Sequence, residues 1–178
     1  VDENLTQISE SFHKTSRFRM KRRDLNSLLM ENKIIGCTMM INKSVIKKLE
    51  MLPQHARMHD WWIGLLSAAF GYVGYLREPS ILYRQHGNNG VGSKQYAAYV
   101  KDRVLSLWRQ KQALKATVLQ GKEFYELFKE ELSQTQKEAL EAFISLEGKG
   151  FFRKRKIVWE YGFLKSTMLR NIGLLLLL

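Results

Sequence analysis

The chain has 178 residues, of which 45% are hydrophobic and 26% are charged, so it can build the core of one domain and is not disordered as a whole. Its single cysteine, Cys37, excludes an intramolecular disulfide and a thiolate zinc cluster and favours a reducing compartment. A formal net charge of +12 indicates a polyanionic partner, which could be nucleic acid, anionic lipid or a phosphorylated small molecule.

The first half of the chain predicts a mixed, turn-rich region that contains both prolines. Residues 36–42 are apolar on both faces, which is typical of a short buried strand. Residues 60–70 have helical spacing, with Gly71 as a natural end. Residues 72–76 and 81–85 predict two more strands, separated by a Glu-Pro turn signal.

The second half predicts helices, because proline is absent from residue 94 onward and apolar residues recur every three or four positions. We expect Gly121 to end the first of these helices. Ser133, with a glutamine three residues later, has the pattern of a capping box that opens another helix, which Gly148 would close. A last, basic helix is expected from residue 151 toward residue 171.

Two segments concentrate the residue types that carry chemistry. In the first, Asp60 stands where a helix is predicted to begin, so its carboxylate could simply cap that helix. Trp61 and Trp62 follow it, and paired tryptophans are usually core residues. The second segment, Tyr83-Arg-Gln-His-Gly-Asn-Asn, places Arg84 and His86 in a loop rich in backbone donors, which suits a phosphate or a metal-bound diphosphate. Alternatively, Arg84 is a surface charge, His86 a satisfied loop histidine and the asparagines turn formers.

Several motifs in order carry a resemblance: Gly36-Cys-Thr-Met-Met-Ile-Asn-Lys, then His59-Asp-Trp-Trp62, then Gly71, then Tyr75-Leu-x-Glu-Pro-x-x-Leu-Tyr-Arg-Gln-His-Gly-x-Asn-x-Val-Gly92. Together they resemble the C-terminal, acceptor-side half of bacterial family-two inverting glycosyltransferases, most closely the rhamnosyltransferase-like members. No single motif is specific, but their order and spacing are.

The resemblance implies an α/β protein (α+β as a fragment). We expect a partial GT-A fold, with a few short strands in residues 1–93 and a predominantly helical C-terminal extension in residues 94–178. The family's Asp-x-Asp motif, which holds the metal and the donor diphosphate, is not found in these residues. We therefore expect a fragment that cannot transfer sugar alone.

The resemblance also implies roles for the residues above. Asp60 matches the catalytic base, His59 would orient it or bind the acceptor, and Trp61 and Trp62 would help to form the acceptor pocket. Arg84 and His86 would act on the leaving diphosphate, with His86 a candidate ligand of a divalent metal, Mg or Mn, in the full-length enzyme.

The implied activity is that of a hexosyltransferase-type enzyme of surface polysaccharide synthesis. It would move a sugar, with rhamnose a candidate, from a nucleotide-sugar donor to a saccharide or lipid-linked acceptor. The alternative, from charge alone, is a noncatalytic module that binds nucleic acid or a membrane surface. Nucleic acid is not expected, because no recognised binding motif is present. Self-association is a further expectation, because the missing half would leave apolar surface exposed.

The C-terminal tail indicates a location. A basic, aromatic-rich helix from Phe151, followed by the leucines at 174–178, could lie on an anionic leaflet and make the protein peripheral at the inner face of the cytoplasmic membrane. The alternative is that these residues pack on protein. The most apolar stretches, 61–76 and 172–178, fall short of the ~20 residues that cross a bilayer, so no membrane span is expected.

Overall fold

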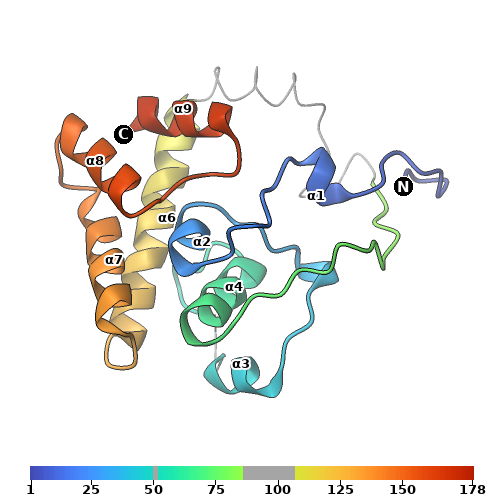
Figure 1. Cartoon of the computed structure of the whole chain (residues 1–178), viewed down its shortest axis with the longest axis horizontal. Coiled ribbons are helices and arrows are strands. Elements are labelled where there is room, and N and C mark those ends of the chain that lie inside the picture. Colours follow the sequence, from blue (N-terminus) through green and yellow to red (C-terminus); the bar gives the residue numbers. More distant parts are fainter. Residues whose placement is uncertain (50–51, 86–106) are drawn as a thin grey trace.

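The computed structural model describes residues 1–49, 52–85 and 107–178 (Figure 1). Within these ranges the regular structure is helical. In chain order the elements are α1 (Phe12–Thr15), α2 (Leu25–Met30), the 3-10 turn η1 (Gly36–Thr38), α3 (Lys43–Lys48), α4 (His59–Phe70), α6 (Leu107–Phe128), α7 (Gln134–Ser145), α8 (Phe151–Glu160) and α9 (Met168–Leu177).

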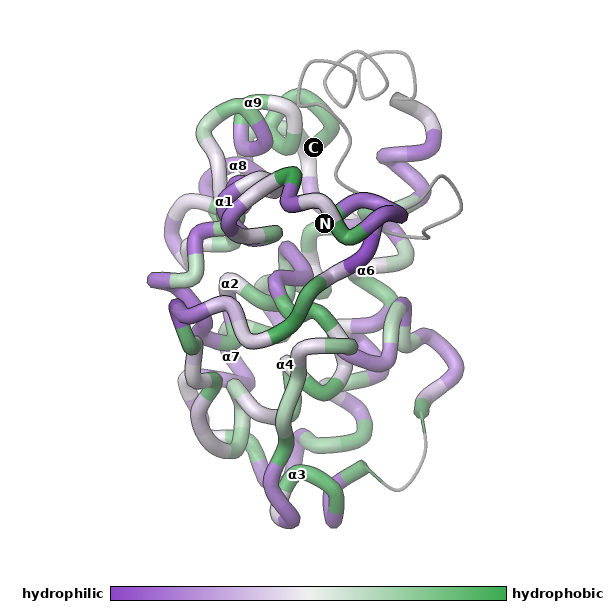
Figure 2. The backbone as a smooth tube through the Cα atoms, turned by 90° about the vertical axis from the view of Figure 1, so that its right-hand side faces the viewer, coloured by the Kyte–Doolittle hydropathy of each residue, from purple (hydrophilic) through white to green (hydrophobic). Residues whose placement is uncertain are grey.

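The hydrophobic core forms where α2, α4, α6 and α7 meet (Figures 1 and 2). Trp62 of α4 is 1% exposed, and its ring meets Phe124 of α6 edge-on with centroids 5.2 Å apart. Leu28 of α2 and Phe143 of α7 are fully buried in the same cluster. Burying such a side chain contributes about 1.5–3 kcal/mol, so this junction supplies much of the stability.

The hairpin of α6 and α7 confirms one helix signal and corrects another. Ser133 and Gln136 form the predicted capping box, in which the backbone N–H of each residue donates to the side chain of the other. The prediction that Gly121 ends a helix was wrong, because α6 continues through it to Phe128. A Cβ at Gly121 would lie 2.9 Å from the ring of Phe143, so this glycine permits the close approach of α6 and α7.

The predicted basic helix from 151 toward 171 is divided into α8 and α9. After α8 the chain reaches Gly162 with a φ of +65°, a left-handed conformation that suits glycine and directs the backbone away from the helix axis. Thr167 then caps α9, its hydroxyl oxygen accepting from the N–H of Arg170. The break allows α9 to turn back toward α2.

A buried ion pair fixes α9 to the end of α2. Arg170 Nη1 donates to Glu31 Oε1 at 2.7 Å, and the backbone N–H of Ser166 donates to Glu31 Oε2 at 2.7 Å. The two charged side chains are only 12% and 9% exposed. Because either charge alone would be poorly solvated there, this pair holds the C-terminal helix in one position.

The expected α/β architecture was wrong for the described part of the chain, which contains no β-strand and therefore no GT-A-like sheet. Residues 36–38 form η1, while 39–42, 72–76 and 81–85 are irregular. A strand needs a hydrogen-bonded neighbour, and these apolar segments find no sheet partner within the described residues. Near residue 85, backbone hydrogen bonds join Val1 to Tyr83 and Gln85, at 3.0 and 2.8 Å. The helical character predicted for the second half is confirmed for residues 107–178.

The predicted boundary between residues 93 and 94 lies in the stretch 86–106, outside the described residues. On either side of it the helices share one core, since α2 and α4 pack with α6 and α7. Among the described residues, no helix combines the length and the apolar character needed to cross a membrane.

Candidate functional site

Asp60 is a buried carboxylate in the first turn of α4, only 4% exposed. Its Oδ1 accepts from Asn32 Nδ2 at 2.9 Å, and its Oδ2 accepts from the backbone N–H of Gly36 at 3.0 Å. The N-cap of α4 is Met58, which makes no side-chain cap bond. The carboxylate therefore binds the facing segment 32–36, while its charge still lies at the favourable end of the helix dipole.

His59, which is exposed, lies against the same glycine. A Cβ added at Gly36 would come within 2.7 Å of His59 Nε2 and 3.4 Å of Asp60 Oδ2. The absence of a side chain at Gly36 thus leaves room for both groups. We call Asn32, Gly36, His59 and Asp60 the Asp60 cluster.

The two tryptophans after Asp60 belong to the core. Trp61 is 5% exposed, and its Nε1–H donates to the carbonyl of Leu28 at 2.6 Å. The Arg57 guanidinium lies over the Trp61 ring, 5.1 Å from its centroid. Trp62 is 1% exposed, within the aromatic cluster of α6. Their structural role is packing, and contact of either ring with an acceptor stays a prediction that requires the ring to be uncovered.

The second predicted segment is described only in part. Arg84 is exposed, and its neighbours Tyr83 and Gln85 bond to the backbone of Val1. His86 lies outside the described residues. The structure therefore brings His59 and Asp60 together, and the expected approach of Arg84 and His86 to them stays a prediction.

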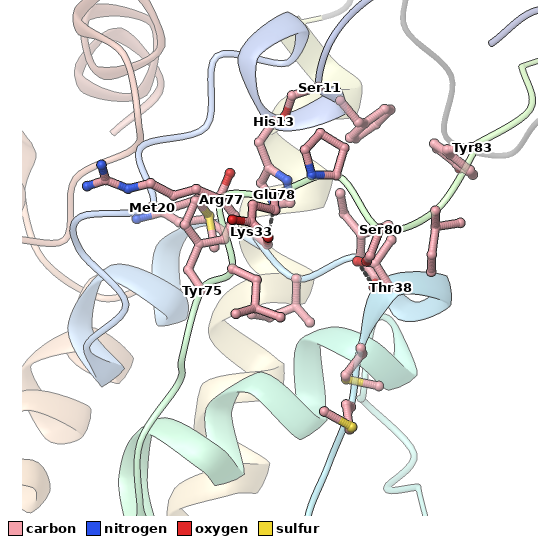
Figure 3. Close-up of a pocket in the computed structure, with 18 of the residues that line it drawn as sticks. Ser11, His13, Met20, Lys33, Thr38, Tyr75, Arg77, Glu78, Ser80 and Tyr83 are labelled. Carbon is pink, nitrogen blue, oxygen red and sulfur yellow. Dashed lines mark hydrogen bonds between the residues drawn. The ribbon is translucent and has the colours of Figure 1, made fainter.

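A cleft of about 790 Å³ (Figure 3) is lined by residues that neighbour the Asp60 cluster in the sequence. Ile63, Gly64 and Ser67 of α4 line it, and they follow Asp60 at spacings of three, four and seven residues, on the same face of the helix. Its other walls are the N-terminal segment, residues 33–41 and residues 72–85. Asp60 itself does not line the cleft. It binds the N–H of Gly36, the first residue of η1, and the last residue of η1, Thr38, lines the cleft.

The polar groups of the cleft come from separate segments, with His13, Lys33, Tyr75 and Glu78 among them (Figure 3). Burial lowers the pKa of His13, whose Nε2 lies 3.3 Å from the carbonyl oxygen of Lys33. Burial likewise lowers the pKa of Lys33, whose ammonium donates to the carbonyl of Arg22 at 2.9 Å.

Sequence reasoning missed the residues that hold Asp60 and α9 in place. Glu31, Asn32 and Lys33 form a polar triplet between the apolar runs 28–30 and 34–35. Each makes a bond to a distant or buried group. Polar residues interrupting a buried run were the available signal, because such groups are costly to bury unless they are paired.

No three His, Cys, Asp or Glu side chains in ranges 1–49, 52–85 and 107–178 lie together as a metal site would require. The divalent metal expected in the full-length enzyme stays a prediction, because its candidate ligand His86 lies outside the described residues.

Comparison with known proteins gives a partial similarity. The chain is 36% identical over 66 residues to the dTDP-rhamnosyl transferase RfbG of Shigella flexneri. The match covers 33% of this chain and 23% of that protein, so it spans less than a quarter of the relative. No protein family matches the chain, and no solved structure does. The similarity supports a relationship to the glycosyltransferases, a class of transferases, over the matched stretch.

Proposed function

We propose that this chain is the acceptor-side part of an inverting glycosyltransferase in which Asp60 is the general base. The partial similarity to a dTDP-rhamnosyl transferase supports the reaction class and makes dTDP-rhamnose the first donor to test. The acceptor would be a saccharide or a lipid-linked saccharide, as in the synthesis of bacterial surface polysaccharides.

The observation that carries the proposal is the carboxylate of Asp60, held against the segment 32–36, of which residues 33–35 line the cleft. Two donors, Asn32 Nδ2 and the Gly36 N–H, hold it, while a carboxylate can accept about four hydrogen bonds in all. Acceptor capacity therefore remains for an alcohol that enters beside Gly36 and the exposed His59. A base held in one orientation reduces the entropy cost of aligning the acceptor.

In the proposed step, Asp60 takes the proton of the acceptor hydroxyl as its oxygen bonds to the anomeric carbon. The bond between that carbon and the donor diphosphate breaks at the same time, and the electron pair leaves with the diphosphate. Because attack and departure occur on opposite faces of the sugar, the configuration inverts. Arg84 is our candidate for contact with the diphosphate, since a guanidinium donates to two phosphate oxygens at once.

The alternative role of Asp60 is a structural link between α4 and residues 32–36. A pair of variants of the full-length enzyme separates the two roles. Asp60→Asn removes the base, and Asp24→Asn removes another aspartate from a helix N-terminus, where its carboxylate caps α2 through the N–H of Ser27. Asparagine is an equally good cap, so Asp24→Asn is the matched control.

The measurement is the release of dTDP from dTDP-rhamnose in the presence of acceptor, together with binding of dTDP to each variant. We expect Asp60→Asn to lower transfer by about 10²- to 10⁴-fold, the range for a general base, with dTDP affinity unchanged. Asp24→Asn should transfer at the wild-type rate. Transfer by folded Asp60→Asn at a rate near wild type would leave Asp60 only its structural role.

A further inference from the structure

The outward side of α9 is apolar. Its exposed side chains form one stripe along the helix, composed of Met168, Leu169, Ile172 and Leu176 at 81%, 45%, 44% and 76% exposure. The opposite side carries Arg170, which turns inward to Glu31. Amphipathic helices of globular proteins normally turn the apolar stripe inward, so the packing of the described residues does not explain this orientation.

Aromatic side chains extend the surface onto α8. Phe152 and Trp159 are 83% and 76% exposed and lie seven residues apart, on one face of the helix, with exposed Lys156 between them. Arg155 donates to the carbonyl of Leu175, so α8 contacts the last turn of α9 (Figure 1). In Figure 2 α9 appears as a largely hydrophobic segment at one end of the molecule. We call the exposed faces of α8 and α9 the C-terminal surface.

The charge around this surface has one sign. Residues 149–178 contain seven Lys and Arg side chains, namely Lys149, Arg153, Lys154, Arg155, Lys156, Lys165 and Arg170, against one acidic residue, Glu160. Apolar and aromatic side chains combined with Lys and Arg are typical of helices that lie in a membrane interface. A second copy of the same surface would bring like charges together, whereas anionic headgroups complement them.

We propose that the C-terminal surface binds an anionic lipid bilayer, with α9 flat at the interface. The stripe runs along the side of α9, from Met168 to Leu176, so all of it enters the acyl boundary only when the helix axis is parallel to the membrane. The basic residues of α8 then reach the phosphate groups. The proposal rests on this surface alone and is independent of the role of Asp60.

The apolar contribution is tested by co-sedimentation of the protein with vesicles of phosphatidylcholine and phosphatidylglycerol. The test variant is Ile172→Ser/Leu176→Ser. The control, Ile46→Ser/Leu127→Ser, alters an exposed isoleucine on α3 and an exposed leucine at the end of α6, 54% and 56% exposed, at the opposite end of the molecule from α9 (Figure 1). We expect at least about tenfold weaker partitioning for the test variant and wild-type partitioning for the control.

The electrostatic contribution is tested by Arg153→Glu/Lys156→Glu, with Lys43→Glu/Lys47→Glu on α3 as the control for net charge. All four side chains are exposed. The α8 variant should bind the anionic vesicles at least about tenfold more weakly than the wild type. Binding of the α3 control should be much less affected. Equal binding of wild type to pure phosphatidylcholine vesicles would overturn the anionic preference.

Trp159 reports the position of the surface directly. Trp108, which is also exposed, is first replaced by phenylalanine, and Trp61 and Trp62 are buried. In this Trp108→Phe background we expect brominated phosphatidylglycerol to quench the fluorescence of Trp159. Absence of quenching, or equal vesicle binding by the α9 variant and its control, overturns the proposal. The proposal is also overturned if the wild-type protein is a dimer that binds no vesicles and the α9 variant is a monomer. The C-terminal surface would then be covered by a second copy of the chain.

Discussion

Two apolar stretches that follow one another in the sequence end in opposite surroundings. Every residue from Asp60 to Leu66 in α4 is buried. In the segment 72–85, by contrast, Tyr72, Leu76 and Leu82 are 77%, 79% and 71% exposed. Helix α4 has α2 on one side and the aromatic rings of α6 on another, whereas 72–85 borders the open cleft. Apolar residues therefore stabilise this molecule only where another element covers them.

The largest expected difference between the two regions is in the cost of truncating a side chain. Trp62→Ala should lower the free energy of unfolding by about 3–5 kcal/mol, because it leaves a cavity among rings that cannot all move to fill it. Leu76→Ala should change it by no more than about 0.5 kcal/mol, because that side chain is already in water. Urea unfolding followed by circular dichroism measures both. A comparable loss for Leu76→Ala would mean that residues 72–85 are covered in solution.

Replacing a helical glycine with alanine should likewise change the free energy of unfolding differently at covered and uncovered positions. In Gly121→Ala the new Cβ meets the ring of Phe143, which is fully buried, so we expect a loss of about 1–3 kcal/mol. In Gly173→Ala nothing lies within 4 Å of the new Cβ, so the better helix propensity of alanine should add about 0.5–1 kcal/mol of stability. Opposite signs in urea unfolding are the expected result, and a stabilising Gly121→Ala would show that α6 and α7 can separate without cost.

The helices were predictable because their signals are local. The capping box at Ser133 and the stop at Gly71 are contained in a few consecutive residues. Gly121 was misread because a glycine at a helix end and a glycine at a helix crossing look alike in sequence, and only the position of Phe143 distinguishes them. The strand predictions failed for a related reason, since an apolar segment becomes a strand only when a neighbour pairs with it.

In the candidate site, too, the local features could be predicted from the sequence and the contacts between distant segments could not. Asp60 could be selected from the sequence, as could the alternative that Trp61 and Trp62 are core residues. The partners of Asp60 could not, because Asn32 and Gly36 lie 28 and 24 positions away along the chain. The expected cap was also misplaced, since the carboxylate bonds across to another segment instead of to its own helix.

The smallest predicted effect is the pH dependence of stability that comes from His13, which lines the cleft. Burial holds the pKa of His13 below its ordinary value near 6.5, so the folded protein favours the neutral imidazole. Between that value and the lower folded pKa, the unfolded chain binds more protons, so stability falls as the pH decreases and is fully present above about 6.5. We expect the free energy of unfolding to drop from pH 6.5 toward pH 5, and His13→Gln to reduce that slope, since glutamine can still donate to the carbonyl of Lys33 without titrating. Urea unfolding across this range measures the difference, with His55→Gln, at an exposed histidine, as the control. Equal slopes for wild type and His13→Gln would mean that water reaches His13 freely and that the cleft walls are more open than the core.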